Sequence, residues 1–359
     1  MARVLVLSAP IGASHTAMAR ALERDLRDRG ASVEVLDDFA VLGPRLNDVL
    51  SRGFDYHLDR VGWSYDLAYR IVMNVGAARR AGEAALEALA GAPMLRAIRA
   101  RDPDVVVSTY PIMSAILGRL RARRRLEVPV CGVVGPLAGL GFWTHPGIDL
   151  HLAMYEQALA EIERRAGPGR AVAIRPLIDR RYFEPRDPAR ARGSLGLDGG
   201  HVVLVNGGGW GAGDLEGGTE AALRAGAHHV LVVCGRNEQA RARLSGRFDR
   251  EGRVRPLGYT DGMDDLLAAS DAVVSATAGV STFEARLRAC RVICSGWLIG
   301  HVRDNARALA AHGLADLATS GGALRGAVAS ALSRRRPPVP PLASLPSGAE
   351  KALHVAEAH

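Results

Sequence analysis

The feature of this sequence that most constrains its fold is the succession of a strand, a glycine-containing turn and a helix, which occurs twice. It begins at residues 3–8 and again at residues 201–206, both rich in Val and Leu. Such short apolar runs predict buried strands, and the apolar spacing that follows the first turn is helical. A buried strand that leads through a tight turn into a helix opens a Rossmann-like unit. The sequence therefore predicts one α/β unit in each half of the chain.

Strands and helices alternate after each opening. In the first half we expect a helix at residues 15–29 and strands at 32–36, 104–108, 128–134 and 149–154. In the second half we expect strands at 229–234, 254–257, 271–275 and 292–295, and helices from about Gly218 and at 238–245, 263–269, 280–289 and 304–312. Strands separated by helices favour right-handed parallel crossovers, so both sheets are predicted to be parallel.

Two domains are the natural division of a chain of 359 residues of which 48% are hydrophobic. We expect an N-terminal domain at residues 1–174, a linker at 175–186, a C-terminal domain at 187–336 and a proline-rich crossover at 337–344. Ser347 is a good N-cap, so a last helix is expected through about Glu357. We predict that this C-terminal helix, within residues 345–359, completes the N-terminal domain. The alternative is a frayed terminus.

Arginine carries almost all of the positive charge. The formal net charge is +8, and Lys351 is the only lysine. A Walker phosphate loop and a pyridoxal Schiff base each need a lysine in a structured core, so neither is expected. The charge alone leaves nucleic acid, an anionic membrane surface and phosphate-bearing ligands open as partners.

Cysteine usage and the N-terminus bear on location. Cys131, Cys234, Cys290 and Cys294 form no CxxC pair, so a reducing compartment is the default. The first residues lead directly into a strand and do not resemble a signal peptide, and no apolar run approaches eighteen residues. We therefore expect a cytoplasmic protein, with peripheral contact to the inner face of the membrane as an option.

Three segments of the second half follow strands and suit a nucleotide. The amides of the glycine-rich turn at residues 207–213 can cradle a diphosphate, although a tight structural turn is the alternative. The second segment opens a helix that carries Glu284, and it consists of Thr277, Ala278, Gly279, Val280, Ser281 and Thr282. Hydroxyls and amides suit phosphate oxygens, while a carboxylate one turn into the helix can bind ribose hydroxyls; an ordinary capped helix is the alternative.

The third segment is Gly300 to Asn305, which offers His301, Asp304 and Asn305 as hydrogen-bonding side chains. Ligands of open parallel sheets bind outside the carboxyl ends of the strands. The three segments are therefore predicted to line one cleft.

These segments resemble the C-terminal domain of glycosyltransferase family 28, in the motif order of monogalactosyldiacylglycerol synthases. The matching residues are 203–209, 234–237, 257–259, 263–266, 278–284 and 300–305. In the first half, residues 103–111 and 142–149 resemble the acceptor domain of these synthases. The transferase that completes lipid II is a related member. The resemblance implies a GT-B fold, in which two Rossmann-like parallel-sheet domains face a central cleft.

The resemblance also implies a nucleoside diphosphate sugar as co-substrate, a uridine one in these families, held by the C-terminal domain. The donor site would comprise Gly207, Gly208, Gly209, Trp210, Arg236, Tyr259, residues 277–282, Glu284 on the ribose, His301, Asp304 and Asn305. The family lysine before Ala278 is Thr277 here. Arg236 is therefore predicted to neutralise the diphosphate, with a surface ion pair as its alternative.

In the family, the first turn is glycine-rich and ends in a histidine, which here is His15. Inverting transfer needs a base for the acceptor hydroxyl, so His15 is the predicted catalytic residue. A helix cap or an interdomain contact is the alternative. The acceptor site would comprise Gly12, Ser14, Tyr110, Pro136, Trp143 and His145. The family usually has Thr-Asp where this chain has Gly135 and Pro136, so a carboxylate that could serve as the base or as its orienting partner is missing.

No DxD metal motif is evident, and we expect no essential metal and no further cofactor. The aromatic segment at residues 46–75 resembles the membrane-contacting element of galactolipid synthases, but core packing is equally open. A basic cluster would attract anionic lipid, with a solvated helix end as the alternative; it consists of Arg119, Arg121, Arg123, Arg124 and Arg125.

The leading hypothesis is an inverting glycosyltransferase that acts on a hydroxyl of a lipid or hydrophobic small molecule, such as a natural-product scaffold. No nucleic-acid partner is expected. One alternative is a non-hydrolysing nucleotide-sugar 2-epimerase. The other is a binding protein that has lost catalysis, which the changes at Ala13, Gly135, Pro136 and Thr277 favour.

Overall fold

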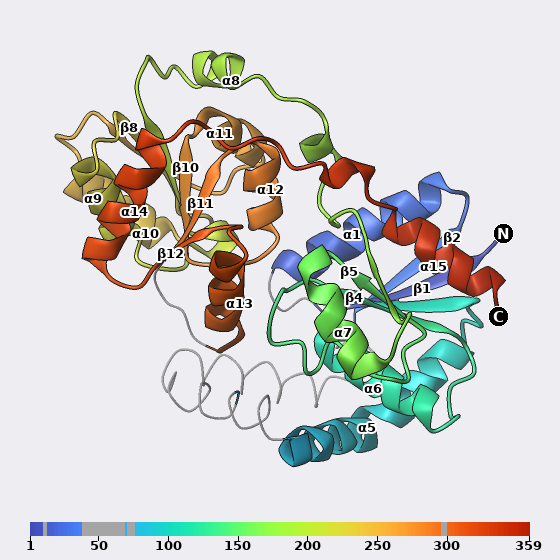
Figure 1. Ribbon diagram of the computed structural model, residues 1–359. Helices are drawn as coiled ribbons and strands as arrows, with labels where there is room; N and C mark the ends of the chain where they lie inside the picture. The colour runs from blue at the N-terminus through green and yellow to red at the C-terminus, as the bar shows by residue number, and fades with distance from the viewer. Residues whose placement is uncertain (10–12, 38–68, 70–75, 296–299) are drawn as a thin grey trace. The chain divides into compact units, whose positions relative to one another are not determined.

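The computed structural model describes residues 1–9, 13–37, 69, 76–295 and 300–359 (Figure 1). The chain divides into two compact units. Unit 1 is Met1–Asp179 with Ala343–His359, and unit 2 is Arg180–Leu342. In the described part of the chain, we find no helix with both the length and the apolar character needed to cross a membrane.

Unit 1 contains a six-stranded parallel sheet in the order β2-β1-β3-β4-β5-β6. The strands are β1 (Arg3–Ser8), β2 (Ser32–Asp37), β3 (Val105–Ser108), β4 (Val130–Val134), β5 (Leu150–Ala153) and β6 (Ala171–Ala173). The helices are α1 (Ala13–Asp28), α5 (Gly76–Arg99), α6 (Pro111–Ala122), α7 (Leu159–Ala166) and α15 (Gly348–Glu357). Because β2 and β3 flank β1 on opposite sides, the order of the strands reverses between β1 and β3.

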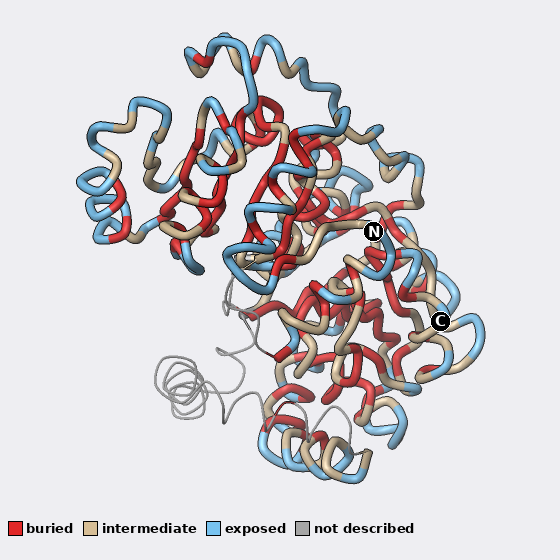
Figure 2. The backbone as a smooth tube through the Cα atoms, turned by 60° about the vertical axis from the view of Figure 1, so that its left-hand side comes forward, coloured by how far each residue is buried: buried red, intermediate tan, exposed pale blue. Residues whose placement is uncertain are grey.

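The core of unit 1 explains why β1 is a continuous apolar run. Leu5 and Leu7 pack in one cluster with Met94 of α5 and Ile116 of α6. Side chains alternate between the faces of a strand, so Val4 and Val6 point to the other face, where they are 2% and 0% exposed. Both faces of the sheet are therefore covered, as is usual for parallel sheets. Figure 2 shows the buried residues in red along the backbone.

Helix α15 belongs to unit 1 although it ends the chain. Ser347 caps it by accepting a hydrogen bond from the amide of Ala349 at 3.1 Å. The amide of Arg175 donates to the carbonyl of Pro346 at 2.9 Å, which ties the start of α15 to the end of the sheet. Ala349 and Ala352 are fully buried, and α15 packs against α1. The capped helix that the sequence predicts after Ser347 is thus an integral element of this unit.

Unit 2 repeats the architecture with the order β12-β11-β10-β7-β8-β9. The strands are β7 (Val202–Asn206), β8 (His229–Val233), β9 (Val254–Leu257), β10 (Ala272–Ser275), β11 (Arg291–Ser295) and β12 (Asp316–Ala318). The helices are α8 (Pro188–Ser194), α9 (Leu215–Arg224), α10 (Glu238–Arg247), α11 (Met263–Ala269), α12 (Ser281–Leu287), α13 (Gly300–Ala311) and α14 (Gly321–Ser333). The order of the strands reverses between β7 and β10.

The predicted strands agree with the structure within two residues at each end, and both sheets are parallel, as predicted. The short edge strands β6 and β12 were not predicted, because three residues carry too little pattern. One assignment was wrong. The sequence placed residues 300–305 mainly in a turn and began the next helix at Asp304, whereas α13 begins at Gly300. Nothing in those residues except the glycine opposes a helix, and Val302, Ala306 and Leu309 have helical spacing.

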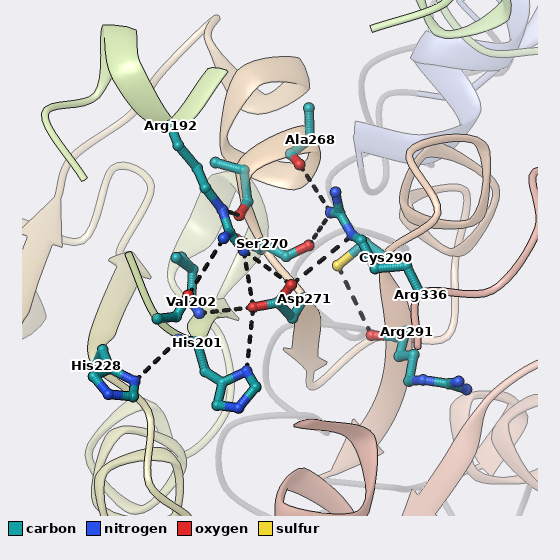
Figure 3. A network of polar contacts seen from close by, with 12 residues as sticks. Arg192, His201, Val202, His228, Ala268, Ser270, Asp271, Cys290, Arg291 and Arg336 are labelled. Carbon is teal, nitrogen blue, oxygen red and sulfur yellow. Dashed lines mark hydrogen bonds and ion pairs between the residues drawn. The ribbon is translucent and has the colours of Figure 1, made fainter. Parts of the chain in front are cut away.

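Asp271 lies directly before β10 and connects separate parts of unit 2 (Figure 3). Its carboxylate accepts hydrogen bonds from Arg192 of α8 and from the amide of Val202, each at 2.9 Å. Arg336, just after α14, donates to the carbonyl of Ala268 at 2.8 Å and lies 4.0 Å from the Asp271 carboxylate. The chain that leaves unit 2 is thus anchored at the amino ends of the strands, away from the carboxyl ends where ligands bind.

Candidate active site

In both units, the predicted site residues flank the point at which the strand order reverses. Leu7 of β1 pairs with Ser108 of β3, so α1 with His15 and the segment after β3 begin side by side. In unit 2, Asn206 of β7 pairs with Ser275 of β10, so the glycine-rich turn and the loop at residues 276–280 also begin as neighbours. Open parallel sheets bind their ligands at such reversal points.

The glycine-rich turn after β7 packs closely on the loop that follows β8. Gly211 has a φ of +65°, and a Cβ there would lie 2.3 Å from the carbonyl oxygen of Cys234. Gly235 has a φ of +56°, and its Cβ would lie 2.3 Å from the carbonyl oxygen of Gly208. Only glycine tolerates both the conformation and the approach. Part of the glycine content therefore serves the structure of the turn.

Several amides of this turn are used within the protein. Gly207 donates to the carbonyl of Val233 at 3.0 Å, and Ala212 donates to the carbonyl of Gly207 at 2.7 Å. The amide of Gly208 donates to Oδ1 of Asn206 at 2.8 Å. The turn consequently offers a diphosphate fewer amides than an open glycine loop would.

Arg236, Trp210 and Tyr259 form one cluster on the surface of unit 2. The guanidinium of Arg236 lies 4.5 Å from the centre of the Tyr259 ring and 5.9 Å from that of Trp210. Its amide donates to the carbonyl of Gly209 at 2.9 Å. The two aromatic residues are 57% and 68% exposed, which is unusual for rings of this size. The structure thus brings together three predicted donor-binding residues from three different strand ends.

The loop after β10 contacts both other predicted donor segments. A Cβ on Gly213 would lie 2.4 Å from the Cβ of Ala276, so the glycine-rich turn and this loop lie directly against each other. On its other side, Nδ2 of Asn305 in α13 donates to the carbonyl of Ala278. The hydroxyl of Thr282, in the first turn of α12, is buried and has no hydrogen-bond partner among the described residues. The three segments therefore form one continuous surface.

The remaining predicted donor residues lie on α12 and α13. Glu284 is half-buried in the first turn of α12. The pKa of Tyr182 is raised, chiefly by burial and secondly by the negative charge of Glu284. The Glu284 carboxylate therefore lies near Tyr182, at the start of unit 2. His301 is exposed in the first turn of α13, and Asp304 lies 3.8 Å from Arg303.

In unit 1, the ring of His15 is surrounded by predicted site residues. Its Nδ1 lies 2.8 Å from the carbonyl oxygen of Thr109. The imidazole and the Tyr110 ring form a T-shaped pair with their centres 5.0 Å apart, and Trp143 stacks on the imidazole at 5.6 Å with an interplanar angle of 25°. These contacts join the start of α1, the end of β3 and the loop after β4. His15 is therefore more than a local helix cap.

His145 has a different environment from the other predicted acceptor residues. A Cβ on Gly118 of α6 would lie 2.4 Å from its ring, and Nδ1 of His145 accepts from the amide of Gly147 at 3.0 Å. Its amide donates to Nε2 of His151 at 3.2 Å. Burial lowers the pKa of both histidines to about 4, so both are neutral near pH 7. This packing gives His145 a structural role, and acceptor contact by it stays a prediction.

Residues 15–169 match the family model described as monogalactosyldiacylglycerol (MGDG) synthase. The chain is 22% identical over 311 residues to a processive diacylglycerol beta-glucosyltransferase of Bacillus cereus, which covers 85% of this chain and 79% of the relative. Its fold resembles that of MurG from Acinetobacter baumannii, with a TM-score of 0.56, 16% identity and coverage of 100% and 99%. It also resembles the spinosyn rhamnosyltransferase SpnG complexed with spinosyn aglycone, with a TM-score of 0.58, 15% identity and coverage of 99% and 95%.

The chain is a glycosyltransferase of GT-B fold, related to the monogalactosyldiacylglycerol synthases. The relationship to family 28 that the motifs predicted is confirmed. The relatives are transferases, which disfavours both the epimerase and the catalytically inactive alternative.

Two predictions fall wholly or mostly outside the described residues of this glycosyltransferase. Gly12 is not described. Of the aromatic segment at residues 46–75, only Tyr69 is described, and it is buried. Ser14 and Pro136 are half-buried, in the first turn of α1 and directly after β4 respectively.

The basic cluster of the glycosyltransferase is largely paired with acidic side chains. Glu87 of α5 lies 3.0 Å from Arg119, 3.3 Å from Arg123 and 3.1 Å from Arg125. Arg121 makes a bidentate pair with Asp149 at 2.7 and 3.0 Å. Most of these arginines therefore form ion pairs that link α6 and the residues after it to α5 and to the start of β5.

Sequence reasoning missed two contributors to these sites. Thr109 lies in a motif that resembles the synthases, but its contribution is a backbone carbonyl, which has no residue signature. Tyr182 lies in the linker and was not assigned to the donor side, although Glu284 is near it. A position directly after a strand at the reversal point is the signal that would have singled out Thr109.

Proposed function

We propose that this glycosyltransferase moves a sugar, with inversion, from a nucleoside diphosphate sugar to a hydroxyl of a lipid acceptor. We further propose a uridine donor. The main observation in support of this function is that each predicted site lies where the strand order of its sheet reverses. Unit 2 would bind the donor and unit 1 the acceptor.

The donor would bind along the continuous surface of unit 2. The guanidinium of Arg236, oriented by its ring contacts, would face the diphosphate, because arginine binds phosphate oxygens through a planar set of donors. Further hydrogen bonds would come from the loop at residues 276–280, which contains Thr277 (the Thr277 loop), from the hydroxyl of Thr282 and from the remaining amides of the glycine-rich turn. Glu284 would accept hydrogen bonds from the ribose hydroxyls.

The chemistry requires one proton transfer and one displacement. The imidazole of His15 would take the proton of the acceptor hydroxyl as its oxygen attacks the anomeric carbon. The bond between that carbon and the diphosphate oxygen breaks, and the nucleoside diphosphate leaves with the electron pair. Arg236 would stabilise the charge on the leaving group. No metal or further cofactor has a part in this proposal.

A lipid acceptor is supported by the relative whose name is a diacylglycerol glucosyltransferase. A natural-product scaffold is the second candidate acceptor, because SpnG was solved with an aglycone. The aromatic rings of Tyr110 and Trp143 beside His15 suit the apolar part of either acceptor. Ser14, in the first turn of α1, and Pro136, directly after β4, would also contribute to the acceptor site.

We propose a cytoplasmic protein that contacts anionic membrane peripherally. Arg123 and Arg125 share the single carboxylate of Glu87 and are half-exposed, with side chains 57% and 47% accessible. Part of their charge thus remains available to a lipid headgroup. Co-sedimentation with anionic but not with neutral vesicles would support this contact, and equal binding to both would contradict it.

The test of the donor is a thermal-shift panel. Uridine, deoxythymidine, guanosine and adenosine diphosphates and their sugar conjugates are added to the wild type and to Glu284→Ala. A ligand at about 100 times its Kd stabilises the folded state by about 2.7 kcal/mol. We expect stabilisation by uridine ligands alone, strongly reduced in the variant.

The test of transfer uses the stabilising sugar nucleotide with diacylglycerol in mixed micelles, followed by mass spectrometry of the lipid. A mass increase of one hexose supports the lipid acceptor. A glycosylated aglycone in a parallel screen, with no lipid product, would replace the lipid by a small molecule. Donor binding without any product on either acceptor class would contradict the enzymatic proposal.

A further inference from the structure

Among the described residues of unit 1, Thr109, Trp143 and Tyr110 contact the imidazole of His15. Its Nδ1 lies 2.8 Å from the carbonyl oxygen of Thr109, Trp143 stacks on it, and it meets the Tyr110 ring in a T-shaped arrangement. Together these contacts restrict both rotation of the ring about its own axis and tilting of its plane. They therefore bear on which ring nitrogen carries a proton.

The Thr109 contact decides the protonation of Nδ1. A carbonyl oxygen can only accept a hydrogen bond, so Nδ1 must be the donor. In a neutral imidazole, the basic lone pair is then at Nε2. The peptide that presents this oxygen is itself held in place. Thr109 is fully buried, and its amide and its hydroxyl both donate to the carbonyl of Leu7, at 2.9 and 3.3 Å.

The indole of Trp143 lies beside Gly135. A Cβ on Gly135 would lie 3.9 Å from Cη2 of Trp143 and 3.3 Å from the sulfur of Met18, which is a tight approach. The amide of Trp143 donates to the carbonyl of Leu140 at 3.1 Å, which restrains the backbone that carries the indole. This backbone hydrogen bond helps to hold the indole where it stacks on His15.

We propose that Thr109, through its carbonyl oxygen, and Trp143, through its ring, are positioning residues that hold His15 as the Nδ1–H tautomer and make Nε2 the base. The inference rests on the proposed function for the role of the base. The tautomer itself is a property of the free protein. A backbone carbonyl and an indole thus perform the orienting function that a carboxylate performs in many histidine bases.

The direct test is nuclear magnetic resonance of the full-length protein labelled with 15N-histidine. The His15 signals are assigned by their loss in His15→Gln, and spectra are recorded at about pH 8.5, where an ordinary imidazole is neutral. Long-range proton–nitrogen correlations distinguish the two tautomers. We expect the protonated nitrogen to be Nδ1. A protonated Nε2, or an equal mixture of tautomers, would overturn the inference.

The role of Trp143 is tested by a pair of variants. Trp143→Leu removes the stacking face, and we expect it to mix the tautomers of His15. Trp143→Phe keeps an aromatic face and is expected to retain the wild-type spectrum. Phe142→Leu, a change at the neighbouring aromatic residue, is the matched control. If Trp143→Leu leaves the spectrum unchanged while the protein is folded, Trp143 is not a positioning residue. If Trp143→Leu does not fold, a mixture of tautomers in Trp143→Phe would count against the stacking.

Transfer kinetics separate this inference from the proposed function. Misplacing a catalytic group by about 1 Å costs on the order of 100-fold in rate, so Trp143→Leu should lower kcat by up to that factor. KM for the sugar nucleotide should stay the same, and Trp143→Phe should restore most of the rate. Full turnover in His15→Gln would show that His15 is not the base, and the tautomer measured by nuclear magnetic resonance would be unaffected by that result. A protonated Nε2 in an active enzyme would instead overturn the inference alone.

Discussion

Glu87 of α5 and Arg119 of α6 form an ion pair at 3.0 Å in which both side chains are largely removed from solvent. Their exposed fractions are 3% for Glu87 and 14% for Arg119. The same carboxylate also pairs with Arg123 and Arg125 from the end of α6. One buried charge thus holds three guanidinium groups, which makes the packing of the two helices depend on it.

We predict that Glu87→Gln destabilises unit 1. Breaking a buried ion pair by removing one partner costs about 3–5 kcal/mol, because the other charge is left uncompensated. The free energy of unfolding, measured with urea, should fall by about this amount. Glu34→Gln is the control, since its pair with Arg101 is half-exposed on the glutamate side and should contribute at most about 1 kcal/mol. Equal small losses for both variants would contradict the prediction.

We predict that His15→Ala strongly slows transfer while it spares nucleotide binding. General base catalysis contributes about 10²- to 10⁴-fold, and kcat should fall by a factor in this range. His15 lies in unit 1, whereas the proposed donor residues lie in unit 2, so the calorimetric Kd for the nucleoside diphosphate should not change. His312→Ala, at the end of α13, serves as a control for loss of a histidine. A kcat of His15→Ala close to that of the wild type refutes the assignment of the base.

We predict that Glu284→Ala weakens nucleotide binding. Hydrogen bonds to a charged group contribute about 1.5–3 kcal/mol, which corresponds to roughly a 10- to 150-fold rise in Kd. Isothermal titration with the nucleoside diphosphate measures the change. Glu220→Ala, which removes a partly exposed partner of Arg224 on α9, should leave Kd within error of the wild type. An unchanged Kd in Glu284→Ala would remove this residue from the ribose site.

We predict that unit 1 loses stability as the pH falls below about 6.5. His151 is fully buried, and burial lowers its pKa to about 4 from the ordinary value of 6.5. Between these values the unfolded chain binds a proton that the folded chain does not, so acid favours unfolding. One pKa unit corresponds to about 1.4 kcal/mol, so the loss through this histidine approaches about 3 kcal/mol near pH 4 and is absent above pH 6.5.

Urea unfolding at about pH 7.5 and about pH 5.5 tests this dependence within a range where most carboxylates stay ionised. His151→Gln removes the titrating ring but keeps an oxygen that can accept the amide of His145. The variant should lose less stability between the two pH values than the wild type. An identical slope in both proteins would show that His151 does not carry the effect.

We predict that transfer continues in the presence of a metal chelator. In the proposed mechanism, Arg236 and hydrogen bonds from the Thr277 loop neutralise the leaving diphosphate, so no divalent cation is required. The initial rate is measured with and without an excess of EDTA after dialysis. Loss of the rate, restored by added Mg²⁺ or Mn²⁺, would contradict the metal-independent mechanism.

The sequence by itself determined the α/β class, the two parallel sheets and most strand positions, because these depend on the local spacing of apolar residues. It also named Trp210, Arg236 and Tyr259, since each follows a strand in a recognisable segment. It did not determine that Arg236 lies over both rings, because the three residues come from different strand ends. Their proximity depends on which strands are neighbours.

Tertiary structure alone decided the environments of the charged and aromatic side chains in unit 1. Arg119 looks like part of a solvated helix end in the sequence, yet it is largely shielded from solvent where α5 presents Glu87 to it. His15 meets the carbonyl of Thr109 because the sheet places β1 beside β3, although 94 residues separate the two. Local patterns specify the strands, but the order of strands in a sheet depends on burial of the whole core, and that order brought these residues together.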